Sequence, residues 1–185
     1  MDFALSANQE SIRDAVGKIC SRFDDAYWLK KDKEGGYPAD FHRALADAGW
    51  LGICMPEEYG GSGLGITDAA IMMHAIARSG AGMSGASAVH MNVFGLNPVV
   101  VFGTKEQCAR MLPPIIDGRD KSCFAVTEPN TGLNTTQLKT RAVRKATNTS
   151  STARRCGSRP RRLPTRFCCW RAPRRWKKSK PRRRA

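Results

Sequence analysis

Aspartate and glutamate are missing from the last part of the sequence: none follows Glu128, although the chain of 185 residues contains 16 acidic residues. Residues 1–140 contain 13 of the 31 Lys and Arg residues and have a net charge of −3. The other 18 basic residues fall in residues 141–185, so the formal net charge of +15 arises there. A strongly basic balance favours nucleic acid or an anionic membrane as a partner. Its uneven distribution confines that inference to residues 141–185.

Long apolar runs and targeting signals are also missing. No apolar run reaches the roughly 18 residues needed to span a membrane, so we expect no membrane association. The chain does not begin with the basic start and apolar run of a secretory signal. Its first residues, MDFALSANQESIRDAV, contain acids where a mitochondrial presequence is rich in arginine and poor in acids. We therefore expect a cytoplasmic protein.

Paired cysteine motifs and late histidines do not occur. Of the seven cysteines, the first four, Cys20, Cys54, Cys108 and Cys123, are scattered without CxxC spacing. The other three lie after residue 150, and no histidine after His90 is available to complete a zinc site. The sequence therefore predicts reduced thiols, as in a cytoplasm, and no metal site.

What the sequence does contain, over residues 1–120, is helical periodicity. Apolar residues recur every three or four positions after Ser6, a candidate N-cap for a helix over residues 6–23. Further helices are expected from Pro38, from Thr67, over residues 84–94 and over residues 104–116. This pattern predicts a mainly α fold, a helical bundle over residues 1–120. Its buried residues are expected to include Phe23, Leu45, Trp50, Ile76 and Val101.

The pattern changes at about residue 121. The run Cys-Phe-Ala-Val-Thr favours a short β-strand, the segment Glu-Pro-Asn-Thr-Gly is rich in turn formers, and LKTRAVR has strand-like alternation. We interpret residues 121–145 as the first strand and the start of an incomplete β domain.

Residues 146–185 are rich in Arg and Pro and lack the apolar residues to build a core, so they predict a disordered basic tail. Such a tail supports an alternative function, in which a helical module binds nucleic acid through its basic C-terminal arm. The basic side chains would contact phosphates, and Trp170 and Trp176 could stack on bases. The sequence has no signature of a specific nucleic-acid-binding fold.

The same segment has a second interpretation when its codons are shifted by one base. Joining the last base of each codon to the first two of the next, with suitable synonymous codons, can spell DKYVVNGEKVWIS across residues 146–159. Some positions leave little freedom: Asn148 before Thr149 permits only Tyr or His, and Trp176 before Lys177 permits only Glu. The shifted text has strand alternation and an Asn-Gly hairpin turn. We therefore interpret residues 146–185 as an out-of-frame translation that begins after about Lys145.

Three segments in this order resemble the motifs of one family. MPEEYGGSGLG, at residues 55–65, is similar to the Pro-Glu-x-x-Gly-Gly loop of acyl-CoA dehydrogenases. FAVTEPNTGLNTTQLKTRAVR, at residues 124–144, is similar to the first middle-domain strand of that family and its Thr-Glu-Pro loop. The shifted text NGEKVWIS resembles the next motif, Asn-Gly-x-Lys-x-Trp-Ile-Ser/Thr. The resemblance implies an N-terminal helical domain over residues 1–120 and the start of the middle β domain over residues 121–145.

The resemblance also implies a cofactor and a reaction. Acyl-CoA dehydrogenases are FAD enzymes of fatty-acid β-oxidation that desaturate acyl-CoA thioesters at the α and β carbons, with hydride transfer to the flavin. Carried over by motif, the strand from Phe124 to Val126 lies along the flavin, and the Thr127 hydroxyl binds it. Gly132 and Leu133 lie in the following turn, close to the cofactor and the thioester.

The sequence departs from the family pattern at one pair of positions near the expected substrate site. Most relatives have Ser-Asp after the glycine of the turn, where this chain has Leu133 and Asn134, and leucine cannot make the polar contact that serine offers. The helix that carries Met91 and Val93 corresponds to one near the acyl chain, so the resemblance implies that both line the substrate pocket. His90, on the same helix, is interpreted as a structural or pocket-lining residue rather than as a catalytic acid.

The resemblance supplies no catalytic residue in this chain. In the relatives the base is a Glu of the C-terminal helical domain, to which no residue here corresponds. The intact enzyme is expected to be a homo-oligomer that passes electrons to an electron-transfer flavoprotein. The 185-residue chain is expected to be inactive alone.

Overall fold

The computed structural model describes residues 4–124, 126–145, 148–152 and 165–168, which fall into two compact units. The first unit contains the described residues up to Phe124 together with 165–168, and the second contains residues 126–145 and 148–152. Most of the predicted basic tail, including Trp170 and Trp176, lies outside the described residues.

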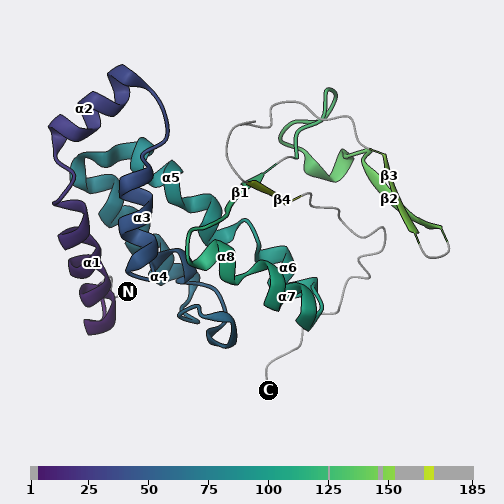
Figure 1. Ribbon diagram of the computed structural model, residues 1–185, viewed down its shortest axis with the longest axis horizontal. Coiled ribbons are helices and arrows are strands. Elements are labelled where there is room, and N and C mark those ends of the chain that lie inside the picture. The colour runs from purple at the N-terminus through teal and green to yellow at the C-terminus, as the bar shows by residue number, and fades with distance from the viewer. Residues whose placement is uncertain (1–3, 125, 146–147, 153–164, 169–185) are drawn as a thin grey trace. The chain divides into compact units, whose positions relative to one another are not determined.

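The first unit is mainly helical, which confirms the predicted fold class (Figure 1). Apart from α2, its longer helices overlap the ranges expected from the periodicity, and short helices follow them up to the first strand. The helices are α1 (Ala7–Cys20), α2 (Asp25–Glu34), α3 (Ala39–Asp47), α4 (Ile66–Ile76), α5 (Gly82–Phe94), α6 (Asn97–Phe102), α7 (Lys105–Met111) and α8 (Pro113–Ile116).

Side-chain caps fix the start of the first two helices. The Ser6 hydroxyl accepts a hydrogen bond from the backbone N–H of Gln9, and the Gln9 side chain accepts one from the backbone N–H of Ser6. This capping box confirms the predicted N-cap of α1. Asp24 caps α2, a helix that the apolar periodicity did not predict because Trp28 is its only buried residue.

The core of the first unit lies between α1, α3, α4 and α5. Around it, Phe23, Tyr27, Trp28 and Phe41 form edge-to-face pairs with ring centroids 5.0–5.3 Å apart. Such pairs add about 0.5–1.5 kcal/mol each beyond the burial of their area. The indole N–H of Trp28 donates to the Phe23 carbonyl oxygen at 3.1 Å, so the ring is buried without an unpaired donor.

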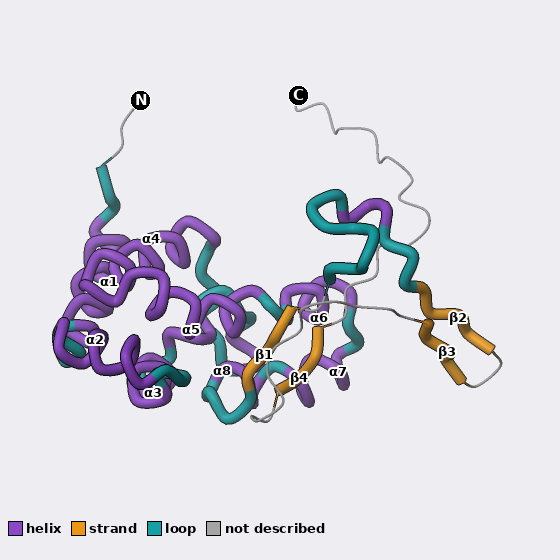
Figure 2. The backbone as a smooth tube through the Cα atoms, turned by 90° about the horizontal axis from the view of Figure 1, so that it is seen from above, coloured by secondary structure: helices purple, strands orange, loops and turns teal. Residues whose placement is uncertain are grey.

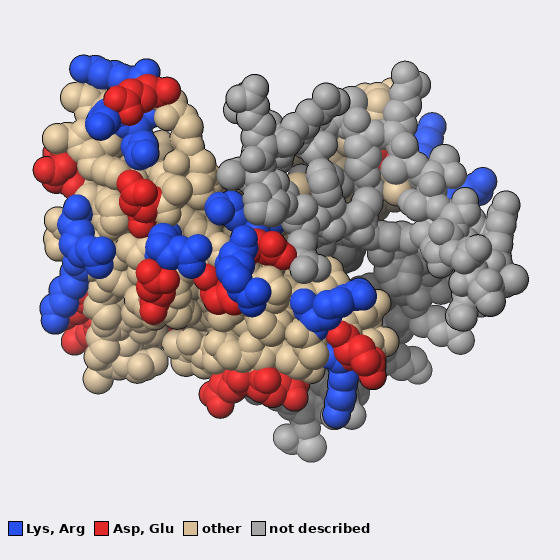
Figure 3. Space-filling view, viewed as in Figure 1, with Lys and Arg blue, Asp and Glu red and all other residues tan. Residues whose placement is uncertain are grey.

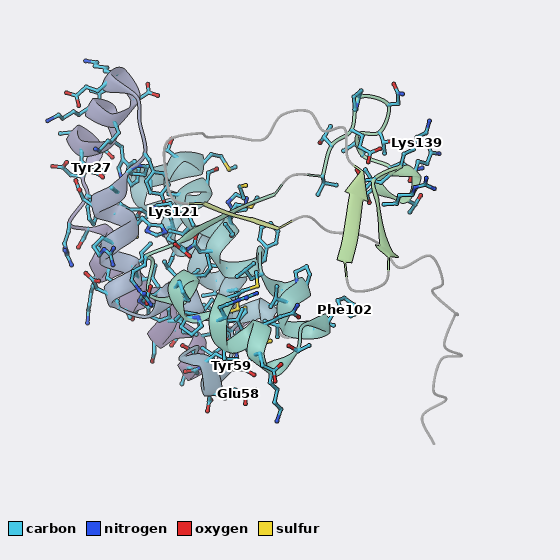
Figure 4. The ribbon with its side chains drawn as sticks, turned by 45° about the vertical axis from the view of Figure 1, so that its right-hand side comes forward. Tyr27, Glu58, Tyr59, Phe102, Lys121 and Lys139 are labelled. Atoms are coloured by element: carbon cyan, nitrogen blue, oxygen red, sulfur yellow. The ribbon has the colours of Figure 1, made fainter. Side chains whose placement is uncertain are left out.

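The expected core residues are mostly found there. Phe23, Leu45 and Ile76 are buried, as predicted, and Trp50 is half-buried against the same core. The prediction for Val101 is wrong, because its side chain is 58% exposed. α6 has only six residues and none of them is buried, and Phe102 projects from its end (Figure 4). The prediction took the apolar run that contains Val101 to be buried, but its side chains stay partly or largely exposed.

Residues Ile66–Phe102 form one helical path of 37 residues, which by length and composition alone could cross a membrane. Its apolar residues have another explanation, because Met72 and Ile76 are fully buried in the core of the first unit. A π-helical turn at Ala77–Ala81 also breaks the path, with Gly80 at a φ of 90°. These features are typical of a core helix pair in a globular unit.

Among the described residues, the strands form two small pairs (Figure 2). β1 (Lys121–Phe124) pairs in parallel with β4 (Thr165–Cys168) within the first unit. β2 (Arg141–Lys145) pairs antiparallel with β3 (Asn148–Thr152) within the second. β1 confirms that a first strand forms here, but it ends at Phe124, so Val126 and Thr127 of the expected strand lie in the loop that follows. Within residues 146–185, which were expected to be disordered, β3 and β4 are paired strands, because backbone N–H and C=O groups can pair whatever side chains a segment carries.

Charged side chains are interspersed on the face of the helical unit shown in Figure 3, with Lys and Arg close to Asp and Glu. Several pairs lie one helical turn apart, such as Lys30 with Glu34 and Arg43 with Asp47. Exposed pairs of this kind contribute little to stability, about 0–1 kcal/mol each. The surface has the mixed character expected from the mildly acidic balance of residues 1–140.

His42, on α3, is a buried histidine with an unpaired ring nitrogen. Its side chain is 2% exposed, and the buried Nε2 atom has no hydrogen-bond partner. Burial lowers the pKa of His42 to about 4, and the positive charges of Lys121 and Arg43 act in the same direction, whereas the nearby Asn92 side chain acts in the opposite direction. The imidazole is therefore neutral in the folded protein at neutral pH.

This lowered pKa makes stability depend on pH. The unfolded chain binds a proton at His42 below a pH of about 6.5, whereas the folded chain does so only near pH 4. The contribution of His42 to the free energy of unfolding is therefore fully present above about pH 6.5. It decreases by about 3 kcal/mol as the pH falls toward 4. We expect His42→Gln to flatten the dependence of the unfolding free energy on pH in urea titrations between pH 7 and 4.5. The exposed His74→Gln variant is the control, and equal slopes for His42→Gln and the parent chain would contradict this assignment.

Candidate functional site

The glycine-rich loop at residues 55–65 packs against the turn before it. The backbone N–H of Gly63 donates to the Met55 carbonyl oxygen at 2.8 Å, and that of Leu64 to the Ile53 carbonyl oxygen at 2.9 Å. A Cβ atom at Gly61 would collide with the backbone of Met55, so only glycine fits there. The loop borders a second buried cluster, formed by Met55, Leu96, Cys108, Leu112, Ile115 and Ile116. The first motif thus has a packing role in the helical unit.

A tight turn forms the start of the second unit. The backbone N–H of Glu128 donates to the Thr131 carbonyl oxygen at 3.0 Å, and the N–H of Thr131 donates to the Glu128 carbonyl oxygen at 3.1 Å. Pro129 and Asn130 occupy the turn between them. Thr131 is buried, and its hydroxyl donates to the Gln137 carbonyl oxygen at 3.4 Å. The turn is therefore fixed by its own backbone and tied to the loop that follows.

The carboxylate of Glu128 closes that loop. It is 7% exposed and accepts hydrogen bonds from the backbone N–H groups of Lys139, at 2.8 Å, and Thr140, at 2.7 Å. Hydrogen bonds to a buried charged group are among the stronger ones in proteins. Residues 128–140 thus form a closed loop, which we call the Glu128 clasp. Sequence reasoning missed this role, although a lone acid in a turn-rich segment was the available signal.

The predicted cofactor residues of the second unit lie around the Glu128 clasp. Val126 is buried, whereas Thr127 and Gly132 are exposed and Leu133 is fully exposed. Apart from the adjacent residues of the chain, no described atom lies within 4 Å of the position that a Cβ at Gly132 would take, so this side of the backbone is open. Phe124, the last residue of β1, belongs to the first unit. Four of the five predicted residues thus lie within the clasp or in the two positions before it.

These residues fit one part of what a flavin needs. A flavin ring is held by backbone donors and hydroxyl groups that fix its orientation. The exposed Thr127 hydroxyl and the open backbone at Gly132 provide groups of both kinds. Leu133 offers an apolar side chain but no hydrogen bond, so the polar contact that serine makes in most relatives has no counterpart at this position.

The predicted substrate residues lie on α5, in the first unit. Met91 is half-buried, and Val93 is 6% exposed and belongs to the helical core. The Nδ1 atom of His90 lies 3.2 Å from the Ser87 carbonyl oxygen, and its ring contacts Phe94 with centroids 5.5 Å apart. These local contacts agree with the interpretation of His90 as a structural or pocket-lining residue. The assignments of Met91 and Val93 to a substrate pocket stay predictions.

Two surface pockets of the helical unit do not involve the predicted site. One, of about 510 Å³, lies between α2 and the π-helical turn, and the other, of about 460 Å³, lies beside α3 and Lys121. Neither is lined by a predicted cofactor or substrate residue. Within the described part of the chain, no group of three or more His, Cys, Asp or Glu side chains could hold a metal ion.

Comparison with known proteins identifies the helical unit. Residues 6–119 match the family model of the acyl-CoA dehydrogenase N-terminal domain. The acyl-CoA dehydrogenase FadE12 of Mycobacterium tuberculosis is 32% identical over 146 residues, which cover 77% of this chain. The match covers only 36% of the relative, so the chain spans about a third of its length.

Solved structures agree with this match. The structure of butyryl-CoA dehydrogenase from Megasphaera elsdenii is 26% identical with a TM-score of 0.67, covering 79% of this chain and 39% of that one. A structure of PigA with FAD and proline has a TM-score of 0.73 at 20% identity, covering 82% of this chain and 40% of that one. The second likeness shows the fold alone.

The Glu128 clasp can be tested by Glu128→Gln. The amide replaces one acceptor oxygen by an N–H₂ group, which would face a backbone N–H of Lys139 or Thr140. Because a hydrogen bond to a charged group contributes about 1.5–3 kcal/mol, we expect amide exchange at residues 139 and 140 to be faster, measured by hydrogen exchange with mass spectrometry. Glu58→Gln, at an exposed position labelled in Figure 4, is the control. Unchanged exchange in Glu128→Gln would show that the carboxylate does not hold the loop.

Proposed function

This chain belongs to the acyl-CoA dehydrogenase family, and we propose that it is the amino-terminal part of an FAD-dependent enzyme that desaturates acyl-CoA thioesters. One observation carries the proposal: the matched helical domain is followed by a strand and a closed Thr-Glu-Pro loop that exposes a hydroxyl and an open backbone. Because the chain spans about a third of its relative, the activity belongs to a longer chain.

The residues of the loop have distinct roles in this proposal. Thr127 donates a hydrogen bond to the edge of the flavin, and the backbone around Gly132 lets the chain approach the cofactor closely. Leu133 contacts the cofactor or the acyl group through apolar surface only. When bound, FAD supplies the hydride acceptor for the β-hydrogen of the thioester. Met91 and Val93 would border the acyl chain from α5.

The remaining parts of the reaction lie beyond this chain. The α-proton has to be taken by a carboxylate, and we assign that role to a Glu of the C-terminal domain of the intact enzyme. General-base catalysis contributes about 10²–10⁴-fold to such a reaction. We propose acyl-CoA as substrate, an electron-transfer flavoprotein as electron acceptor and a homo-oligomer for the intact enzyme. The residues from 146 onward are proposed to be an out-of-frame translation of the same middle domain.

The proposal predicts a contrast between two proteins. The purified 185-residue chain should be colourless and should not reduce a dye acceptor with any acyl-CoA, because it lacks the base and the other strands of the site. A strand or hairpin without partners is only marginally stable and cannot form a flavin site alone. The protein restored by one added base at the junction of Lys145 and Ala146 should be yellow and active. Stoichiometric FAD in the short chain, or a colourless restored protein, would contradict the proposal.

The role of Thr127 has its own test in the restored protein. Removing the hydroxyl in Thr127→Ala should weaken FAD binding by about tenfold, the effect of losing one hydrogen bond of about 1.4 kcal/mol. Thr67→Ala, at an exposed position on α4, is the matched control. FAD affinity can be measured by fluorescence titration of the apoprotein, and equal affinities for Thr127→Ala and Thr67→Ala would remove Thr127 from the site.

A further inference from the structure

α5 and the start of β1 are joined by two buried side chains that reach in opposite directions. Asn92, on α5, is 1% exposed, and its amide nitrogen donates to the carbonyl oxygens of Ile115 and Asp120, both at 3.1 Å. Ser122, on β1, is 6% exposed, and its hydroxyl donates to the carbonyl oxygen of Met91 on α5. α5 thus donates to α8 and to the residue just before β1, and β1 donates back to α5.

The close approach of the two elements depends on a glycine. A Cβ atom at Gly95 would lie 3.0 Å from the Cβ of Ser122, closer than side chains normally come. Gly95 also donates its backbone N–H to the Met91 carbonyl oxygen at 2.8 Å, so that oxygen accepts two hydrogen bonds. The strand therefore lies directly against the end of the helix, with no side chain between them at this point.

The hydrogen bonds at Asp120 and Ser122 together fix the position and the direction of the chain as it enters β1. The Asn92 amide holds the backbone at Asp120, just before β1, and the Ser122 hydroxyl holds β1 itself two residues later. Buried donors and acceptors of this kind are costly to leave unpaired, so the segment cannot move without losing both bonds. Functional sites are commonly held by such supporting hydrogen bonds.

We propose that Asn92 and Ser122 are positioning residues that set the spacing between α5 and β1, and with it the acyl preference of the enzyme. This rests on the proposed function, in which Met91 borders the acyl chain and Phe124, at the end of β1, lies along the flavin. Ser122 bonds directly to the backbone of Met91 and precedes Phe124 by two residues on the same strand. Asn92 and Ser122 thus connect α5, proposed to border the acyl chain, with β1, proposed to reach the flavin, both within the first unit.

The link itself is tested in the 185-residue chain by hydrogen exchange of residues 121–124. Ser122→Ala and Asn92→Leu should each speed exchange there by at least about fivefold, because local opening becomes easier when one buried hydrogen bond is lost. Ser122→Thr keeps the hydroxyl and should retain the parent exchange rate. Ser87→Ala, at an exposed position on α5, is the control. Unchanged exchange in both Ser122→Ala and Asn92→Leu would overturn the link.

The positioning role is tested in the protein restored by one added base. Ser122→Ala should change the ratio of kcat/KM between short and long acyl-CoA substrates by about fivefold or more while FAD content stays at one per chain, and Ser122→Thr should recover the parent ratio. If Ser122→Ala is active and shows faster exchange at residues 121–124 but keeps the parent ratio of kcat/KM, the positioning role is wrong. A restored parent protein that binds no FAD would contradict the proposed function and, with it, the acyl preference assigned to Asn92 and Ser122. Faster exchange of residues 121–124 in the variants would still support the link between α5 and β1.

Discussion

Burial of one apolar face by each of α1, α3, α4 and α5 is the interaction on which the rest of the structure depends. Phe41, Leu45, Met72 and Ile76 are fully buried where these helices meet, and removing a buried side chain of this size typically costs about 2–5 kcal/mol. α8 and the glycine-rich loop at residues 55–65 pack against this core. Ile116 of α8 lies against Gly52 at the edge of the core, and the glycine-rich loop closes the second buried cluster beside it.

The first strand depends in turn on this helical unit. β1 has four residues, too few to be stable by itself, and α5 holds it through Asn92 and Ser122. In the second unit, the Glu128 carboxylate stabilises the turn by accepting hydrogen bonds from the backbone N–H groups of Lys139 and Thr140. These two sets of hydrogen bonds explain how each short segment keeps a defined local structure within its own unit.

The sequence was informative where local periodicity and capping determine structure. The helix starting after Ser6, the buried residues Phe23, Leu45 and Ile76, and the strand at β1 all follow from patterns of a few residues. Val101 was predicted wrongly because an apolar residue is buried only if another element covers it, and periodicity does not contain that information. α2 escaped prediction because one indole ring fixes it to the core.

The candidate site was predictable only in part, for a related reason. The Thr-Glu-Pro motif located the turn, but the hydrogen bonds of Glu128 to Lys139 and Thr140 span more than ten residues, and no local pattern specifies them. The contacts of Asn92 with Ile115 and Asp120 are longer still in sequence. Motifs thus indicate candidate site residues, whereas the hydrogen bonds that hold the surrounding backbone in place become visible only in three dimensions.

The central claim is that this chain is the front of a longer acyl-CoA dehydrogenase whose reading frame changes after about Lys145. The most direct measurement is the nucleotide sequence from codon 144 to well beyond codon 185. With one base added at the junction of Lys145 and Ala146, the account predicts an open frame of several hundred codons in total that encodes a Trp-Ile-Ser/Thr strand and a downstream catalytic Glu. A stop codon in that frame soon after position 185 would contradict it.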